Sequence, residues 1–114
     1  MIKALDPFGG GLGAHGEVCG AVIGGLAAIG LLFGRYKLGE EADIKMWAYS
    51  HEFLKRFQKE IAQESYLCRD IVQVNWMDPA QVKEYHKGEK FTKCKTLVGK
   101  TAGLIWELME RAKG

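Results

Sequence analysis

The stretch that decides the fold is Glu17-Val18-Cys19-Gly20-Ala21-Val22-Ile23-Gly24-Gly25-Leu26-Ala27-Ala28-Ile29-Gly30-Leu31-Leu32-Phe33-Gly34-Arg35-Tyr36. None of the 17 residues from Val18 to Gly34 is charged, and small residues recur at every fourth position from Gly16 to Ala28. The acidic residue before this run and the basic residue after it predict one helix over about residues 17–36. Each glycine weakens a helix by about 1 kcal/mol relative to alanine, so we expect the glycine face to lie against another backbone. This helix should be central and buried on all sides.

The rest of the chain also favours helices. Apolar side chains recur at intervals of three and four over about residues 40–62 and 90–112, which predicts two amphipathic helices. Asp78-Pro79 is a typical helix start and predicts a shorter helix ending near Lys87-Gly88, whereas residues 65–73 favour a turn or one short helix. We therefore expect a single all-α domain over residues 1–114, in which four to five helices pack around the Gly-rich helix. Residues 1–16 should form a Gly-rich lead-in.

Composition and charge argue against several classes of protein. The chain has 114 residues, of which 47% are hydrophobic and 26% are charged, as is ordinary for one globular domain. Its net charge of +2 is too small to indicate nucleic-acid binding. The uncharged run is shorter than the ~20 residues that a membrane span needs, so we expect a buried helix and no membrane partner; a membrane-associated protein is the alternative. No secretory signal precedes the glycines, which predicts a cytoplasmic protein.

Three cysteines, Cys19, Cys68 and Cys94, are the candidate functional residues. An odd number of distant cysteines does not predict a disulfide framework, and without a C-x-x-C motif any pair must be assembled by the fold. Cys19 falls in the first turn of the predicted helix, Cys68 precedes Arg69, and Cys94 lies between two lysines. Positive potential of this kind lowers a thiol pKa, which favours redox thiols or metal-binding thiolates. The alternative is that these cysteines are inert members of the core, as free cysteines often are.

Two kinds of ligand site are considered for the Gly-rich region and the cysteines: a metal or iron–sulfur site, and a dinucleotide-binding loop. The three thiolates, with His15 as a fourth ligand, would suit zinc or an iron–sulfur cluster, although His15, His51 and His86 are scattered as surface histidines usually are. Gly11-Leu12-Gly13-Ala14-His15-Gly16 matches the dinucleotide pattern G-x-G-x-x-G. That motif requires a preceding strand, which residues 1–8 do not predict, so a turn leading into a helix is the better interpretation.

The Gly-rich run from Phe8 to Arg35 contains the box Cys19-Gly20-Ala21-Val22-Ile23-Gly24, and Cys68 and Cys94 follow it. In this order and spacing the chain resembles the C_GCAxxG_C_C family, whose members are proposed to be redox-active. The resemblance covers most of the chain from Phe8 onward, and it implies a helical prokaryotic protein whose cysteines serve redox or metal chemistry. The chain is also similar to the iron–sulfur part of split-Soret cytochromes, which implies an iron–sulfur cluster and electron transfer. It has no haem motif C-x-x-C-H.

Two departures from the family pattern bear on the site. The family's first cysteine has no counterpart upstream of the glycines, and Cys19 stands one place earlier than the thiol of a Gly-Cys-Ala box. One place on a helix is about 100° of rotation, which would aim the thiol elsewhere. A missing N-terminal helix would leave apolar surface exposed, so we expect a homodimer.

The function predicted from the sequence is that of a redox-active protein with an unknown redox partner. Cys19, Cys68 and Cys94 would converge for thiol–disulfide, metal or iron–sulfur chemistry. The alternative is a structural or interaction module in which the cysteines are buried and inert. Nothing in the sequence indicates enzymatic turnover beyond thiol chemistry.

Overall fold

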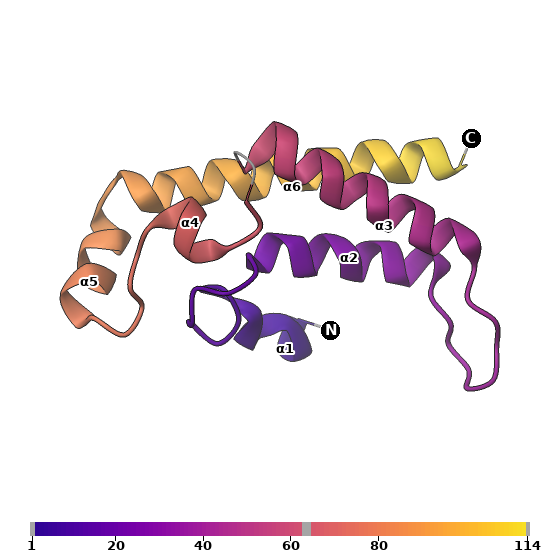
Figure 1. Ribbon diagram of the computed structural model, residues 1–114, viewed down its shortest axis with the longest axis horizontal. Coiled ribbons are helices and arrows are strands. Elements are labelled where there is room, and N and C mark those ends of the chain that lie inside the picture. Colours follow the sequence, from indigo (N-terminus) through magenta and orange to yellow (C-terminus); the bar gives the residue numbers. More distant parts are fainter. Residues whose placement is uncertain (1, 63–64, 114) are drawn as a thin grey trace.

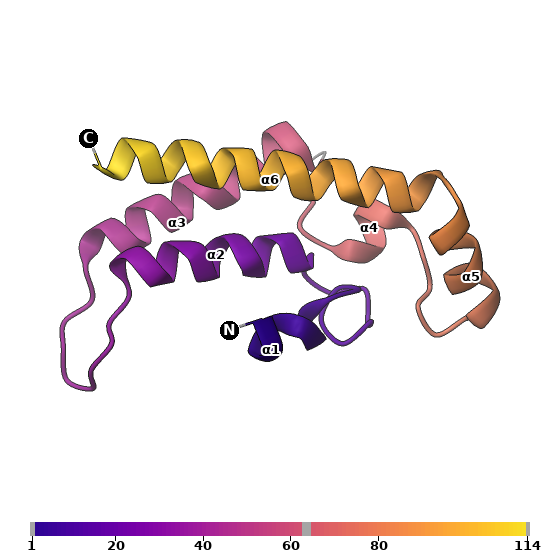
Figure 2. The same ribbon diagram turned by 180° about the vertical axis from the view of Figure 1, so that it is seen from behind.

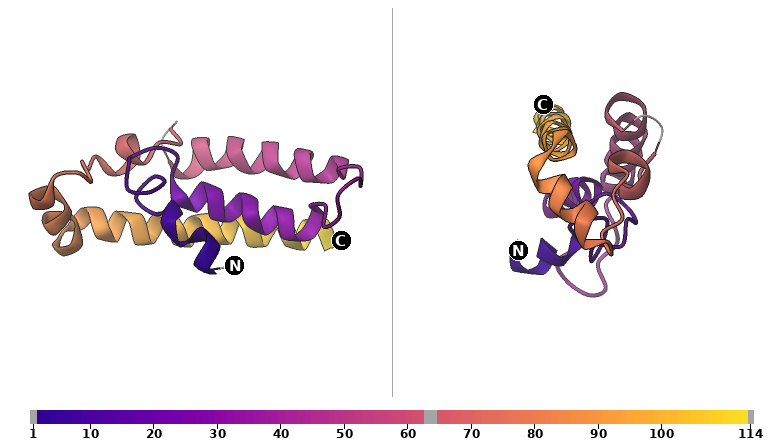
Figure 3. Two further views of the ribbon diagram at one scale, coloured as in Figure 1. Left: turned by 90° about the horizontal axis from the view of Figure 1, so that it is seen from below. Right: turned by 90° about the vertical axis from the view of Figure 1, so that its left-hand side faces the viewer.

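The computed structural model of the protein describes residues 2–62 and 65–113 and consists of helices joined by loops. The longest helices are α2 (Gly20–Phe33), α3 (Ile44–Arg56) and α6 (Glu89–Lys113), and they lie side by side (Figure 1). Viewed along the long axis, α2 lies between α3 and α6 (Figure 3, right). Within the described residues no strand forms, and only Val18 and Leu67 make an isolated antiparallel bridge. The predicted all-α class is confirmed.

Shorter elements lie at the ends of the long helices. The chain begins with α1 (Ile2–Leu5) and the 3-10 helix η1 (Asp6–Phe8), and the π-helical turn η2 (Phe57–Ile61) extends α3. The short helices α4 (Cys68–Val72) and α5 (Pro79–Lys87) lie near the N-terminal end of α6 (Figure 2). The predicted start of α5 is confirmed, because the Asp78 side chain accepts a hydrogen bond from Ala80 N–H at 3.0 Å.

Two of the predicted helix starts are wrong for reasons of local hydrogen bonding. The second helix begins at Ile44 rather than near Glu40, because Asp43 caps it by accepting a hydrogen bond from Lys45 N–H at 2.8 Å. The Gly-rich helix begins at Gly20 rather than Glu17, because the bridge at Val18 holds the preceding backbone in an extended form. It also ends at Phe33, three residues before the predicted end. Cys19 is therefore the N-cap residue and not part of the helix.

The prediction that α2 is buried on all sides is wrong. Its buried residues are Val22, Gly25 and Ile29, and Leu31 is 69% exposed. Gly25 packs against α3 so closely that a Cβ there would come within 2.2 Å of the Phe53 ring. Gly24, in contrast, has no atom within 4 Å of such a Cβ. The close approach of helices that the glycines predicted exists at Gly25 and not at Gly24.

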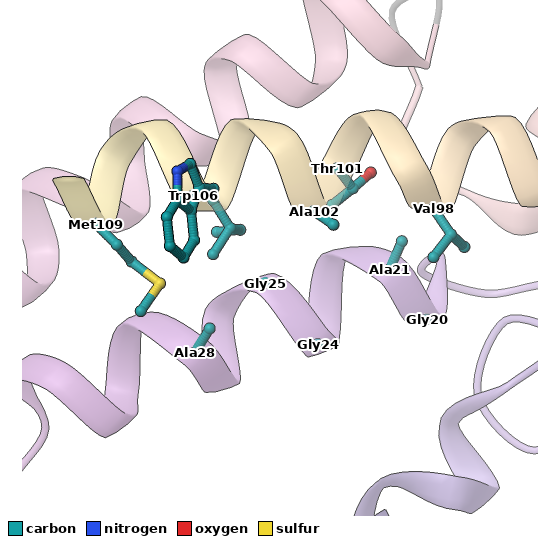
Figure 4. Close-up of a pocket in the computed structure, with 11 residues that line it drawn as sticks. Gly20, Ala21, Gly24, Gly25, Ala28, Val98, Thr101, Ala102, Trp106 and Met109 are labelled. Atoms are coloured by element: carbon teal, nitrogen blue, oxygen red, sulfur yellow. The ribbon is translucent and has the colours of Figure 1, made fainter. Parts of the chain in front are cut away.

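Four other small residues of α2 border an open groove. This groove has a volume of about 500 Å³ and runs between α2 and α6 (Figure 4). Gly20, Ala21, Gly24 and Ala28 lie on one side of it, opposite Val98, Trp106 and Met109 of α6.

The core lies where the three long helices meet. Its most deeply buried side chains are Val22 of α2, Phe53 of α3, Phe57 of η2 and Leu108 of α6. Ion pairs at the surface join α3 and α6, because Arg56 contacts Glu107 and Arg111 contacts Glu52. Such exposed pairs add little stability, so burial of the aromatic and aliphatic side chains holds the helices together.

One further property concerns membranes. Among the helices of residues 2–62 and 65–113, none combines the length and the apolar character that crossing a bilayer would require.

Candidate functional site

The segment between η1 and α2 folds into a tight left-handed loop. Residues 10–14 all have positive φ, and the loop closes when Gly16 N–H donates to Gly10 O at 3.0 Å and Glu17 N–H to Gly11 O at 2.8 Å. Glycine tolerates this conformation far better than other residues do. Because a 3-10 helix and not a strand precedes the loop, the G-x-G-x-x-G match lacks the context of a dinucleotide site.

Backbone hydrogen bonds join this loop to the segment that carries Cys68. Cys19 N–H donates to Tyr66 O at 2.7 Å, and Cys68 N–H donates to Glu17 O at the same distance. Arg69 N–H also donates to Gly16 O at 3.1 Å. These bonds flank the bridge between Val18 and Leu67, so two cysteines that are 49 positions apart in sequence lie on neighbouring backbone segments.

The third cysteine comes from α6. Lys93 Nζ donates to Ile71 O at 2.8 Å and Lys90 Nζ donates to Gln73 O at 2.7 Å, which ties the C-terminal end of α4 to α6. Cys94 follows Lys93 directly and faces the same space as Leu97 and Val98, one turn further on.

All three cysteines line one cavity of about 270 Å³. Its walls come from the glycine loop, the start of α2, α4, the segment after α4, α5 and α6. The lining residues include Gly11, Cys19, Gly20, Cys68, Ile71, Val72, Trp76, Tyr85, Cys94 and Leu97. Cys68 is 5% exposed, whereas Cys19 and Cys94 are partly exposed. The structure therefore brings the three predicted residues together; their roles as redox thiols or ligands stay a prediction.

The prediction that positive charge lowers the thiol pKa values is wrong for two of the cysteines. Burial raises the pKa of Cys19, and the nearby Ala21 and Val22 amides at the start of α2 lower it by less. Burial also raises the pKa of Cys68, and the Cys19 and Cys94 thiols add to this rise while Trp76 opposes it. Both thiols therefore favour their neutral form.

The neighbouring basic residues do not stabilise the thiolates, because their side chains bind other groups. The Arg69 guanidinium pairs with the Glu17 carboxylate at 3.3 Å, and the Lys93 ammonium binds Ile71 O. The Lys95 ammonium lies 4.5 Å from the centre of the Phe91 ring. Basic residues that neighbour the cysteines in sequence therefore did not place their charges beside the sulfur atoms.

Two aromatic side chains belong to the cavity and were not predicted. The rings of Trp76 and Tyr85 meet edge to face with centroids 4.8 Å apart. Burial raises the pKa of Tyr85, and the nearby Cys94 thiol adds to this rise, so the hydroxyl stays protonated beside the sulfur. Trp76 lies in the loop before α5, where no sequence periodicity indicates which way a side chain faces.

His15 does not line the thiol cavity. It is exposed, its Nδ1 lies 2.8 Å from Gly13 O, and it borders a separate hollow with Arg69 and Gln73. His51 and His86 are exposed as well, as expected. Over residues 2–62 and 65–113, no group of three His, Cys, Asp or Glu side chains has an arrangement that could hold a metal ion.

Comparison with known proteins places the chain in a family. It belongs to the family described as "Putative redox-active protein (C_GCAxxG_C_C)", which matches residues 1–108. No curated protein and no solved structure matches the chain. The resemblance seen in the sequence is thus confirmed for this family, whereas the similarity to split-Soret cytochromes stays a prediction.

The displaced thiol of the family box still reaches the cavity. The expected rotation of about 100° assumes that both positions are helical, but Cys19 precedes the helix. A Cβ on residue 20 would lie 3.0 Å from Phe8 O, and Cys19 itself lines the thiol cavity. The exchange of cysteine and glycine therefore keeps a thiol in the shared site.

Proposed function

We propose that this protein is a thiol-based redox protein in which Cys68 forms a reversible disulfide with Cys19 or Cys94. The observation that carries the proposal is the convergence of three thiols from separate elements on one cavity. Membership of a family described as redox-active supports the same class of chemistry. We take Cys68 as the common member of the pair because it is the most buried of the three thiols and its segment is tied to both others: backbone hydrogen bonds join it to the Cys19 segment, and Lys93, next to Cys94, binds the carbonyl of Ile71 on the helix that Cys68 begins.

The chemistry is thiol–disulfide exchange with a small or protein disulfide. Two cysteine thiols and one disulfide R–S–S–R give the cysteine disulfide and two R–SH, so two electrons and two protons pass to the oxidant. Because burial raises the pKa values of Cys19 and Cys68, the reduced state gains no thiolate stabilisation. A dithiol of this kind is a reductant rather than an oxidant, since strong disulfide oxidants owe their potential to a stabilised thiolate.

The test begins with protein purified without oxygen and treated with oxidised glutathione. Alkylation and mass spectrometry should count three free thiols before treatment, one after it, and three again after dithiothreitol. Cys68→Ser should prevent the intramolecular disulfide, whereas only one of Cys19→Ser and Cys94→Ser should do so. Three thiols that stay free in the wild-type protein, or a disulfide that persists in Cys68→Ser, would contradict the proposal.

Metal analysis of the same preparation decides between this chemistry and the metal alternative. Three thiolates supply three of the four ligands of a zinc site or of an iron–sulfur cluster. Stoichiometric zinc or iron, with thiols that react only after chelation, would replace the dithiol proposal with metal binding by the same residues.

A further inference from the structure

The indole N–H of Trp76 has no hydrogen-bond partner among the described residues, although it is buried. Buried donors in folded proteins are nearly always paired, and an unpaired one at a reactive site calls for an explanation. The ring itself is held in place, because it packs edge to face on Tyr85 and lines the thiol cavity. The donor is thus fixed in position beside the Cys68 sulfur, and it makes no hydrogen bond of full geometry with the described part of the chain in this state.

The side chains that line the cavity limit which groups could accept a hydrogen bond from the Trp76 N–H. The side chains that line it are apolar apart from the Tyr85 hydroxyl, the Trp76 indole and the three thiols. Trp76 acts on Cys68, because its N–H lowers the pKa of that thiol although burial raises it overall. A neutral thiol is a weak acceptor, whereas a thiolate is a strong one.

We infer that Trp76 donates a hydrogen bond to the Cys68 sulfur when that sulfur carries negative charge, which makes Cys68 the leaving group when the disulfide is reduced. This inference rests on the proposed function. A thiolate R–S⁻ attacks the accessible sulfur of Cys19 or Cys94 and forms a mixed disulfide there. The bond to Cys68 breaks, and its electron pair goes to the Cys68 sulfur. A second R–S⁻ then releases the other cysteine and forms R–S–S–R, so the step balances.

The limited access to Cys68 and the Trp76 donor both favour this direction of attack, and the donor offsets part of the cost that burial places on a charged Cys68 sulfur. Cys68 is 5% exposed, so an external thiol reaches its partner sulfur more easily than Cys68 itself. The titratable groups that face Cys68 are Cys19, Cys94 and Tyr85. The nearest basic residues in sequence do not compete with Trp76, since Arg69 pairs with Glu17 and Lys93 binds Ile71 O. Trp76 is therefore a positioning residue for the thiolate.

The test compares Trp76→Phe, which keeps an aromatic ring but lacks the N–H, with Trp47→Phe as a matched control. Trp47 lies on α3 and is 54% exposed, away from the cavity. The oxidised proteins are treated briefly with glutathione, and the mixed disulfides are mapped by mass spectrometry. Wild type and Trp47→Phe should carry glutathione mainly on Cys19 or Cys94. In Trp76→Phe the ratio of this product to the Cys68 product should fall about tenfold, as expected for a hydrogen bond to a charged group.

A second measurement does not depend on disulfide formation. In the reduced proteins, the pH midpoint for alkylation of Cys68 should rise by about one unit in Trp76→Phe, because a factor of ten in thiolate stability equals one pH unit. Trp76→Leu provides a further apolar variant if the phenylalanine packs poorly. An unchanged product ratio and midpoint in Trp76→Phe would overturn the inference. If no disulfide forms in the wild type the proposed function fails, and the midpoint alone then decides whether Trp76 acts on Cys68.

Discussion

Gly11 lies so close to Cys68 that a Cβ on residue 11 would come within 2.6 Å of the Cys68 Cβ. The same Cβ would also approach Glu17 N at 2.6 Å, and Gly11 has a φ of +73°. The left-handed loop can therefore close over the thiol cavity only if residue 11 has no side chain. The glycine-rich sequence and the position of a candidate redox thiol are physically linked at this contact.

Replacing Gly11 with alanine should destabilise the protein by about 2–5 kcal/mol, because left-handed backbone strain and overpacking add. Gly13→Ala is the matched control, since φ is +60° there but the nearest atom lies 3.7 Å away. It should lose only the strain contribution of about 1–2 kcal/mol. Urea unfolding measures both variants, and equal losses would show that residue 11 does not contact Cys68 in this way.

Adjacent glycines on α2 should respond in opposite directions to the same substitution. Gly25→Ala places a methyl group within 2.2 Å of the Phe53 ring and should cost about 1–3 kcal/mol. Gly24→Ala meets no atom within 4 Å and should stabilise the protein by roughly 0.5–1 kcal/mol through helix propensity. Thermal unfolding of the two variants would contradict this packing if Gly24→Ala proved the more damaging change.

Helix positions were predictable from the sequence to the extent that local rules decide them. The periodicity of residues 90–112 predicted α6, and Asp78-Pro79 predicted the start of α5. The start of α2 was not predictable, because a long-range bridge between Val18 and Leu67 overrides the dipole argument at Glu17. Likewise, the small-residue pattern cannot say which glycine meets a partner, since this depends on where Phe53 lies.

The sequence identified the three cysteines of the site, but not the residues around them or the degree to which they are buried. Three widely spaced cysteines without a C-x-x-C motif predicted that the fold would bring them together, and all three line one cavity. The direction of the pKa shifts was missed because burial raises both pKa values while the nearby cations bind other groups, and both features are properties of the folded chain. Trp76 and Tyr85 were missed because tertiary packing alone brings a loop residue and an α5 residue to the thiols.

The contact between Lys93 and the Ile71 carbonyl should control access to Cys68. Lys93→Met removes a charge-assisted hydrogen bond to the end of α4 and should cost about 1–2 kcal/mol. Because α4 begins at Cys68, its loosening should also raise the alkylation rate of this buried thiol several-fold. Lys95→Met is the control, since Lys95 lies over the Phe91 ring rather than on α4. Equal alkylation rates in the two variants would argue against this anchoring role.

Raised thiol pKa values make stability depend on alkaline pH. Burial lifts the pKa values of Cys19 and Cys68 above the ordinary 9.0, so the folded protein holds these protons to higher pH than the unfolded chain. Their contribution is fully present below pH 9.0, and it is lost as the pH rises from there through the folded-state pKa values. The free energy of unfolding, measured in urea with a reductant, should therefore fall across this window.

A double variant isolates the thiol contribution from other alkaline effects. Cys19→Ala combined with Cys68→Ala lowers stability at every pH by removing buried volume, but its stability should decline less steeply above pH 9.0 than that of the wild type. The comparison uses the difference between the two slopes, so ionisation of lysines and tyrosines common to both proteins cancels. Parallel slopes would mean that the two thiols ionise equally readily in the folded and unfolded chains. This result would contradict the claim that burial in the cavity protects Cys68 from ionisation.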